Sequence, residues 1–351
     1  MGNTKNNVDR DKIDFVLPWV DGSDKEWLAR KRMFFESANN ISSFSEANAD
    51  CRYQDYGLLK YWFRTVERFA PWVNRVFFVT CGQKPDWLDE SNPKLRLVNH
   101  EDYIPAEYLP TFHSNTIELN LHRIADLSEQ FVLFNDDTFL LRPVKPEFFF
   151  RKGLPILPCD LGIPNRMSIG CMGSPVFIKN SAVLNRNLNV KHLVWSNIWK
   201  FADIYHLGFR RTVKNILSFA INGFVIPGDF GHLPQSHLKS TFDEIWQKHP
   251  HIMEVTSRSK FRSDDCVNQW LACSWNMLNG RFYPANEKKR GKNFTIYNDE
   301  DRIRICDAIL RQAFPMLCIS ERETTPEIIR YFQDVSKTFD KLLPDKSSFE
   351  K

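Results

Sequence analysis

Long apolar runs are missing from this sequence of 351 residues, and none approaches the roughly 20 residues of a membrane-spanning helix. The segment 1–12 is polar and charged, and no apolar segment of signal-peptide length follows it. The eight cysteines form no C-x-x-C pair and show no zinc-finger spacing. We therefore expect a cytoplasmic chain whose cysteines are mostly buried thiols in a reducing compartment.

A strong excess of one charge is missing as well, since 47 Lys and Arg residues against 43 Asp and Glu residues give a net charge of +4. Duplex nucleic acid is bound through a strong basic stripe, so we expect no nucleic-acid partner. A modest cationic excess suits an anionic small ligand equally well. Apolar residues make up 42% of the chain, which is enough to build a core in one large domain or two ordinary ones.

The most informative stretch is Phe131–Asp137, an apolar run of strand length that ends on Asn135, Asp136 and Asp137. Such a run predicts a strand buried on both faces, and in open α/β sheets ligands bind beyond the carboxyl ends of these strands. Two adjacent carboxylates can hold Mg²⁺ or Mn²⁺, which prefer carboxylate and phosphate oxygens. The alternative interpretation is a strand that ends in a polar turn, because Asn and Asp are turn residues.

A first buried strand is predicted over residues 13–20, followed by a turn that contains Asp21, Gly22 and Asp24. In an α/β chain this loop can offer a nucleotide both carboxylates and free backbone N–H groups. An ordinary turn is the alternative interpretation.

Apolar spacing over residues 57–69 predicts an amphipathic helix that Pro71 ends, and residues 75–80 predict the next strand. Strand, helix and strand in this order imply a right-handed parallel crossover. Arg52 and Asp55 stand just before the helix, where Arg52 can bind a phosphate bidentately and Asp55 can hold the arginine or a sugar hydroxyl. An exposed ion pair is the alternative.

A helix is predicted over residues 114–125, with Ser114 as its N-cap. Glu118 and His122 are four residues apart, so they lie on one side of it. The strand that ends in the two aspartates follows directly, which would gather four titratable groups. Considered alone, His122 is better explained as a surface histidine paired with Glu118.

The apolar pattern of residues 152–224 is less regular, which indicates an insertion. Its aromatic and basic side chains include Lys191, Trp195, Trp199, Lys200, Tyr205, Arg210, Arg211 and Lys214. They are compatible with a helical cap over the sheet, with a surface that stacks on a polymer acceptor, or with a patch that touches anionic lipid. We expect a catalytic α/β domain over 13–298 and helices over 299–351 packed on it, with fraying from Pro344.

Two later loops carry candidate ligand-binding groups. His232 and His237 lie among Gly and Pro residues, which predicts a loop position from which they reach a ligand and do not fill a core. Arg262 precedes residues 263–270, which predict the capped start of a helix, and cations beside a helix N-terminus form an anion site.

Taken in order, four blocks resemble the Stealth family of sugar-phosphate transferases, bacterial capsular and exopolysaccharide phosphotransferases related to the animal N-acetylglucosamine-1-phosphotransferase. The first block is Ile13–Val16 with Trp19–Asp24. The second block begins with Arg52, Tyr53 and Asp55, and continues through Glu118 and His122 to Asn135–Asp137. The third block is His232–Pro234, and the fourth is Phe261–Arg262 with Asp265 and Asn268. Gln54 and His113 depart from the family pattern. Either Asp264 or Asp265 can be the matching acid of the last block.

The resemblance implies a Rossmann-like, nucleotide-sugar-transferase-type sheet flanked by helices, with a mostly helical insertion and a helical C-terminus. It implies a UDP-linked sugar donor, a polysaccharide or lipid-linked glycan acceptor, and transfer of the sugar with its proximal phosphate. UMP is then the leaving group. A peripheral contact of the protein with the inner face of the plasma membrane is compatible with the resemblance.

The resemblance also assigns roles. Asp136 and Asp137 would hold Mg²⁺ or Mn²⁺, Arg262 would bind the transferring phosphoryl group, and His232 would accept the proton of the attacking hydroxyl, with a paired Asp as the fallback base. The substrate-binding positions would be Asp21, Gly22, Asp24, Arg52, Asp55, Glu118, His122, Asn135, Asp265 and Asn268. The alternatives are a metal-dependent glycosyltransferase that releases UDP, and a non-catalytic carbohydrate-binding protein.

Overall fold

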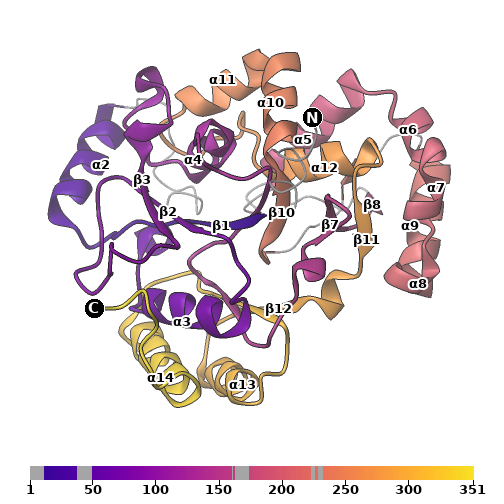
Figure 1. The fold of residues 1–351 in the computed structure, drawn as a ribbon. Helices are drawn as coiled ribbons and strands as arrows, with labels where there is room; N and C mark the ends of the chain where they lie inside the picture. Colours follow the sequence, from indigo (N-terminus) through magenta and orange to yellow (C-terminus); the bar gives the residue numbers. More distant parts are fainter. Residues whose placement is uncertain (1–11, 38–49, 160, 163–173, 223–225, 228–231) are drawn as a thin grey trace, which may run out of the picture.

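The computed structural model describes residues 12–37, 50–159, 161–162, 174–222, 226–227 and 232–351 (Figure 1). The predicted polar tail therefore lies outside the described residues, except for Lys12. Within the described ranges, no helix combines the length and the apolar character that a bilayer crossing needs. The predicted α/β class is confirmed, because a central sheet lies between layers of helices.

Five strands form the central sheet in the order β10-β4-β1-β2-β3. Their bounds are β1 Ile13–Pro18, β2 Val76–Thr80, β3 Leu95–Asn99, β4 Gln130–Leu133 and β10 Gln235–Leu238. Strands β1 to β4 are parallel, and β10 runs antiparallel to β4. The strands predicted at 13–20, 75–80 and 131–134 are thus present, and the parallel crossover from β1 to β2 is confirmed.

Alternate side chains of each strand supply two separate cores, because successive residues point to opposite faces. Phe15 and Leu17 of β1 pack in the core under α3 (Leu59–Phe69), whereas Val16 packs in the core on the other side. The helices of the first layer are α3, α13 (Asp299–Leu310) and α14 (Pro326–Leu342), and those of the second are α4 (Ser114–Leu119), α10 (Lys239–Lys248), α11 (Pro250–Arg258) and α12 (Trp270–Leu278). Figure 1 shows the two layers on opposite sides of the sheet.

The C-terminal region contributes a strand that the sequence did not predict. β13 (Met316–Ser320) lies between β12 (Gly291–Thr295) and β5 (Thr138–Leu140) in a second sheet. The amide of Ile319 donates to the carbonyl of Asp137 at 2.9 Å. The two predicted C-terminal helices are present, and the strand between them reaches the segment that follows β4.

The insertion is mostly helical, as predicted. Its described helices are α5 (Ser174–Asn187), α6 (Val190–Ser196), α7 (Ile198–Phe201), α8 (Ile204–Leu207) and α9 (Phe209–Asn222). Figure 1 shows α6 to α9 at one end of the molecule, beyond β8 (Leu161–Gly162) and β11 (Tyr283–Ala285), and not over a face of the central sheet.

Three local predictions were wrong. The helix predicted over 114–125 ends at Leu119 and is followed by a 3-10 turn, and Ser114 is its first residue, so it is not the N-cap. Residues 263–269 precede α12 without forming its first turn. His237 lies on β10, fully buried against Phe131 and Phe242, and burial lowers its pKa to about 3.

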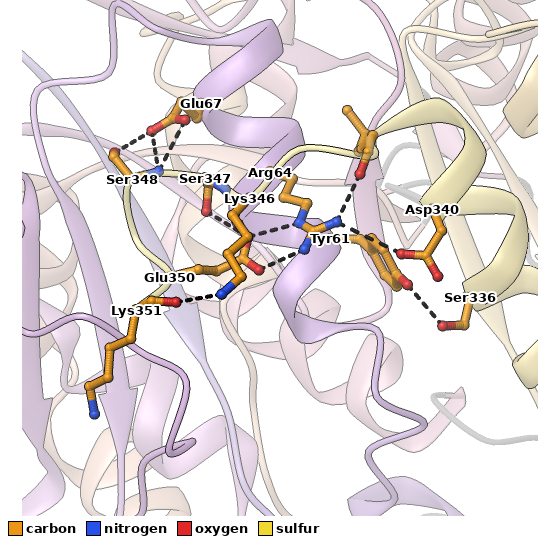
Figure 2. Close-up of polar contacts among 11 residues, drawn as sticks. Tyr61, Arg64, Glu67, Ser336, Asp340, Lys346, Ser347, Ser348, Glu350 and Lys351 are labelled. Atoms are coloured by element: carbon orange, nitrogen blue, oxygen red, sulfur yellow. Dashed lines mark hydrogen bonds and ion pairs between the residues drawn. The ribbon is translucent and has the colours of Figure 1, made fainter.

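The last residues do not fray, because they are anchored to α3 (Figure 2). The guanidinium of Arg64 donates to both carboxylate oxygens of Glu350, at 2.8 and 2.7 Å, and to the carbonyl of Leu343 at 2.8 Å. The side chain of Arg64 is 8% exposed and that of Glu350 is 5% exposed. A bidentate pair buried to this extent fixes the tail in one position.

We expect Glu350→Gln to lower the free energy of unfolding by about 3 kcal/mol, because it removes the buried counter-charge of Arg64 and leaves only the exposed Asp340, 3.8 Å away. Urea denaturation followed by circular dichroism measures the change. A matched control is Glu90→Gln, which breaks the exposed Lys84–Glu90 pair of similar length, 2.6 Å, and should cost less than about 1 kcal/mol. Equal losses in the two variants would contradict the buried anchor.

Candidate active site

Parallel pairing brings two polar loops to one edge of the sheet. Val16 of β1 is in register with Leu133 of β4, and the amide of Phe134 donates to the carbonyl of Val16 at 2.9 Å. The chain therefore leaves both strands at the same edge, with Asp21 after β1 and Asn135 after β4. This is the edge where ligands gather in open α/β sheets.

Four carboxylates stand at this edge: those of Asp55, Asp136, Asp137 and Glu321. Desolvation by the surrounding protein raises the pKa of Asp136 well above its ordinary range, although part of the residue still reaches solvent. The charges of Asp137, Asp55 and Glu321 raise this pKa further. Burial also raises the pKa of Asp55. Burial and the charge of Asp137 raise the pKa of Glu321 to about 7, although Arg52 opposes this shift. Burial and the neighbouring charges therefore both oppose full ionisation of the cluster.

His232 meets this cluster from the loop before β10. The amide nitrogen Nδ2 of Asn135 lies 3.0 Å from His232 Nε2, and Asp137 Oδ2 lies 3.5 Å from the same ring nitrogen. The imidazole is about half exposed, at 49%. Nε2 therefore lies between the side-chain amide of Asn135 and the carboxylate of Asp137, which together position the ring at the rim of the cluster.

The donor set fits a divalent cation. Oδ1 of Asp137 is buried and has no hydrogen-bond partner among the described residues. Cys318 donates from Sγ to Asp137 Oδ2 at 3.4 Å, and burial holds the pKa of this thiol well above its ordinary value. One ligand atom each from Asp137, His232 and Cys318 lies within 4.8 Å of the others. Since the thiol stays protonated, the carboxylate oxygens are the stronger ligands, and these suit a hard cation.

The loop after β1 is held rigidly beside the cluster. A Cβ atom on Gly22 would lie 1.9 Å from the carbonyl oxygen of Tyr53, so only glycine allows this approach. Asp24 accepts from the amide of Trp27 at 2.8 Å at the start of α2 (Lys25–Ser37), which occupies its carboxylate as a helix cap. The charge of Asp21 adds to the raised pKa of Asp55, which places Asp21 beside the cluster.

A second group lies at the start of α4. Arg262 donates from Nη2 to the hydroxyl of Ser114 at 2.9 Å. Glu118, on the same helix, is buried, and burial raises its pKa to about 8 against the opposing charge of Arg262. This group adjoins the Arg52 segment, because the hydroxyl of Tyr53 donates to the carbonyl of Phe112 at 3.1 Å. A helix that leads into a parallel strand begins at the carboxyl edge of the sheet, so Arg262 lies toward the same edge as the carboxylates.

Three predicted residues have other neighbours. His122 stacks on Phe242 of α10. Helix α10 follows the last residue of β10, which pairs with the first residue of β4. His122 therefore lies toward the edge of the sheet opposite to the carboxylates. Burial lowers the pKa of His122 to about 3. Asp265 is exposed and pairs with Lys179 at 2.9 Å. Asn268 is buried and accepts from the amide of Asn180 at 2.8 Å, which ties the loop before α12 to α5.

Sequence reasoning missed Glu321 and Cys318. A usable signal was present, because the apolar run Leu317–Ile319 ends on Ser320 and Glu321 in the same way that the run before Asp136 ends on polar residues. The prediction of helices over 299–351 included no strand in this segment, and therefore did not include the acid that follows the strand.

Comparison with known proteins gives two family matches: residues 11–34 match Stealth protein CR1, conserved region 1, and residues 52–155 match Stealth protein CR2, conserved region 2. The capsular polysaccharide phosphotransferase WcwK of Streptococcus pneumoniae is 38% identical over 347 residues, which cover 97% of this chain and 98% of the relative. The receptor polysaccharide phosphotransferase WefC of Streptococcus gordonii is 38% identical over 344 residues, with coverages of 97% and 99%. The exopolysaccharide phosphotransferase cps2G of Lactiplantibacillus plantarum is 33% identical over 347 residues, with coverages of 97% and 96%.

Glu321→Gln should change how stability depends on pH. Burial raises the pKa of Glu321 in the folded protein to about 7, from an ordinary value of 4.5, so its contribution to stability is present at low pH and is lost as pH rises through that window. The variant has no such loss. We expect it to gain on the order of 2 kcal/mol over wild type between acid and neutral pH in buffer that contains EDTA. Urea denaturation across the pH range measures this difference.

The matched control is Glu323→Gln, which removes an exposed carboxylate two residues away. Its free energy of unfolding should follow that of wild type at every pH. A constant offset between Glu321→Gln and wild type would mean that Glu321 does not share its environment with the other acids.

Proposed function

Since this chain belongs to the Stealth family of sugar-phosphate transferases and is a transferase, we propose that it moves a hexose- or N-acetylhexosamine-1-phosphate from a UDP-sugar to a hydroxyl of a growing cell-surface polysaccharide. The bond between the two phosphates of the donor breaks, a phosphodiester forms, and UMP leaves. The observation that carries this proposal is the carboxylate cluster with His232 bound at its rim. The acceptor is a polysaccharide or a lipid-linked glycan, and the reaction takes place in the cytoplasm at the inner face of the plasma membrane.

Asp136 and Asp137 would hold Mg²⁺ or Mn²⁺, with Asp55 and Glu321 as the further carboxylates of the cluster. The cation would neutralise the donor's pyrophosphate and the negative charge that develops on the leaving group. The pKa values of Asp136, Asp55 and Glu321, raised by burial and further by neighbouring carboxylates, support this assignment, because a bound cation would stabilise their charged forms.

His232 is the residue best placed to accept the proton of the attacking hydroxyl. The side chain of Asn135, 3.0 Å from Nε2, would position the ring, and Asp137 Oδ2, 3.5 Å from Nε2, would stabilise the imidazolium that proton uptake produces. In phosphoryl transfer the protein contributes mainly positioning and charge neutralisation, so an oriented imidazole beside the carboxylates meets the requirement.

Two arginines would bind the anionic parts of the donor. Arg52 lies close enough to Glu321 to oppose the rise in its pKa, which places a guanidinium at the carboxylate cluster. Arg262 is oriented by Ser114 at the start of α4. A guanidinium binds phosphate oxygens bidentately, so Arg262 suits the transferring group and Arg52 suits the donor.

The released nucleotide tests the reaction. We expect the purified protein, given UDP-sugars, Mg²⁺ and a glycan acceptor, to release UMP and to form a new diester that phosphorus NMR detects. EDTA should abolish the release, and excess Mg²⁺ or Mn²⁺ should restore it, because the cation neutralises the pyrophosphate. Release of UDP would instead establish glycosyl transfer, and glycan binding without consumption of any UDP-sugar would establish a carbohydrate-binding protein.

Substitutions test the assigned roles. His232→Gln should lower kcat by about 10²- to 10⁴-fold, the range that general base catalysis supplies, with little change in KM for the donor. Asp136→Asn should weaken Mg²⁺ binding, measured by titration calorimetry, and lower kcat. Asp265→Asn, a matched change of an exposed acid that pairs with Lys179, should keep turnover within about threefold of wild type. Folded His232→Gln and Asp136→Asn proteins with normal turnover would show that the site lies elsewhere.

A further inference from the structure

Helix α9 in the insertion buries three polar side chains, together with the apolar Phe219, and leaves four large apolar side chains exposed. Thr212, Asn215 and Ser218 are buried. The exposed stripe of the same helix consists of Phe209, Val213, Ile216 and Leu217. A helix that packs on a core through its apolar stripe shows the opposite arrangement. The outward face of α9 therefore has the character of a buried surface.

Asn215 fixes this orientation. It is fully buried, its side-chain oxygen accepts from the amide of Leu161 at 2.9 Å, and its side-chain nitrogen donates to the carbonyls of Cys159 and Phe201 at 3.2 and 3.1 Å. Rotation of α9 to bury its apolar stripe would break these three bonds and leave buried backbone groups unpaired, which is costly. The apolar face is thus held outward by the fold itself.

The neighbouring short helices α7 and α8 contact α9 and carry further exposed, large apolar side chains. Trp199 on α7 and Tyr205 on α8 are each 83% exposed, and Ile204 on α8 and Trp195 on α6 are exposed as well. Figure 1 shows α6 to α9 together at one end of the molecule. Exposed apolar side chains gathered in this way mark an interaction surface.

The charge of the insertion is one-sided. Residues 174–222 contain seven Lys and Arg residues and one acid, Asp203, which gives +6 in a chain whose net charge is +4, so the rest of the chain carries −2. Asp203 is engaged with His206 at 2.6 Å. The basic side chains of Arg186, Lys191 and Arg210 are exposed.

We propose that the α6–α9 face, formed by the exposed apolar residues named above, docks on the surface of an anionic lipid bilayer. Trp and Tyr side chains are favoured at the boundary between headgroups and acyl chains, and basic residues are attracted to anionic headgroups. A second copy of the chain would bring two surfaces of like charge together. A glycan would stack on the aromatic rings but would leave Val213, Ile216 and Leu217 uncovered. This inference concerns where the protein works, and it does not depend on the proposed reaction.

Co-sedimentation of the full chain with lipid vesicles tests the proposal. We expect binding to phosphatidylcholine vesicles that contain phosphatidylglycerol, weaker binding to phosphatidylcholine alone, and a decrease with added NaCl. The triple variant Trp199→Ser, Tyr205→Ser, Phe209→Ser should bind the anionic vesicles at least about tenfold more weakly, because three interfacial side chains are removed. Its thermal unfolding midpoint should match wild type, since all three side chains are exposed.

The matched control is Tyr297→Ser, Ile303→Ser, Leu310→Ser, which removes exposed apolar side chains outside the insertion and should bind vesicles as wild type does. Failure of wild type to bind anionic vesicles would overturn the proposal, as would normal binding by the Trp199 triple variant. A dimer in light scattering that the same variant dissociates would assign the face to a second copy. Loss of binding to soluble acceptor oligosaccharide with vesicle binding unchanged would assign it to the glycan.

Discussion

Several carboxylates come together at the carboxyl edge of the central sheet because three separate segments of the chain end or turn there. Asp136 and Asp137 leave β4, Asp55 precedes α3, and Glu321 follows β13. Burial disfavours the charged forms of these carboxylates and raises the pKa values of Asp136, Asp55 and Glu321, and repulsion from neighbouring carboxylates raises them further. The fold tolerates this arrangement only because the supporting segments cannot move apart.

The supporting contacts are local and stiff. Gly22 touches the backbone of Tyr53, Asp24 caps α2, and the amide of Asp21 donates to the side chain of Gln83 at 2.9 Å. Such contacts hold the acids near one another in the absence of a ligand. A preorganised site of this kind spends little free energy on reorganisation when charge develops on a substrate.

Much of the fold could be predicted from the sequence, because β1, β2, β4 and α3 each carry a clear apolar pattern. The structure also brings together Asp55, Asn135, Asp136, Asp137 and His232, which were singled out from strand ends, turns and family blocks. Long-range pairing could not be predicted, because nothing local shows that β13 inserts beside β5 and delivers Glu321. His237 was misjudged for a related reason: the polar run of β10 becomes a buried strand only through its pairing with β4.

The position of β13 has a consequence for how the protein is made. Segments nearer the N-terminus leave the ribosome first and can begin to fold while translation continues. The strands β1 to β4 can pair at that stage, with Asp136 and Asp137 in place but with neither Cys318 nor Glu321 beside them. A nascent chain therefore presents an incomplete carboxylate cluster, and the enzyme completes that cluster only near the end of synthesis.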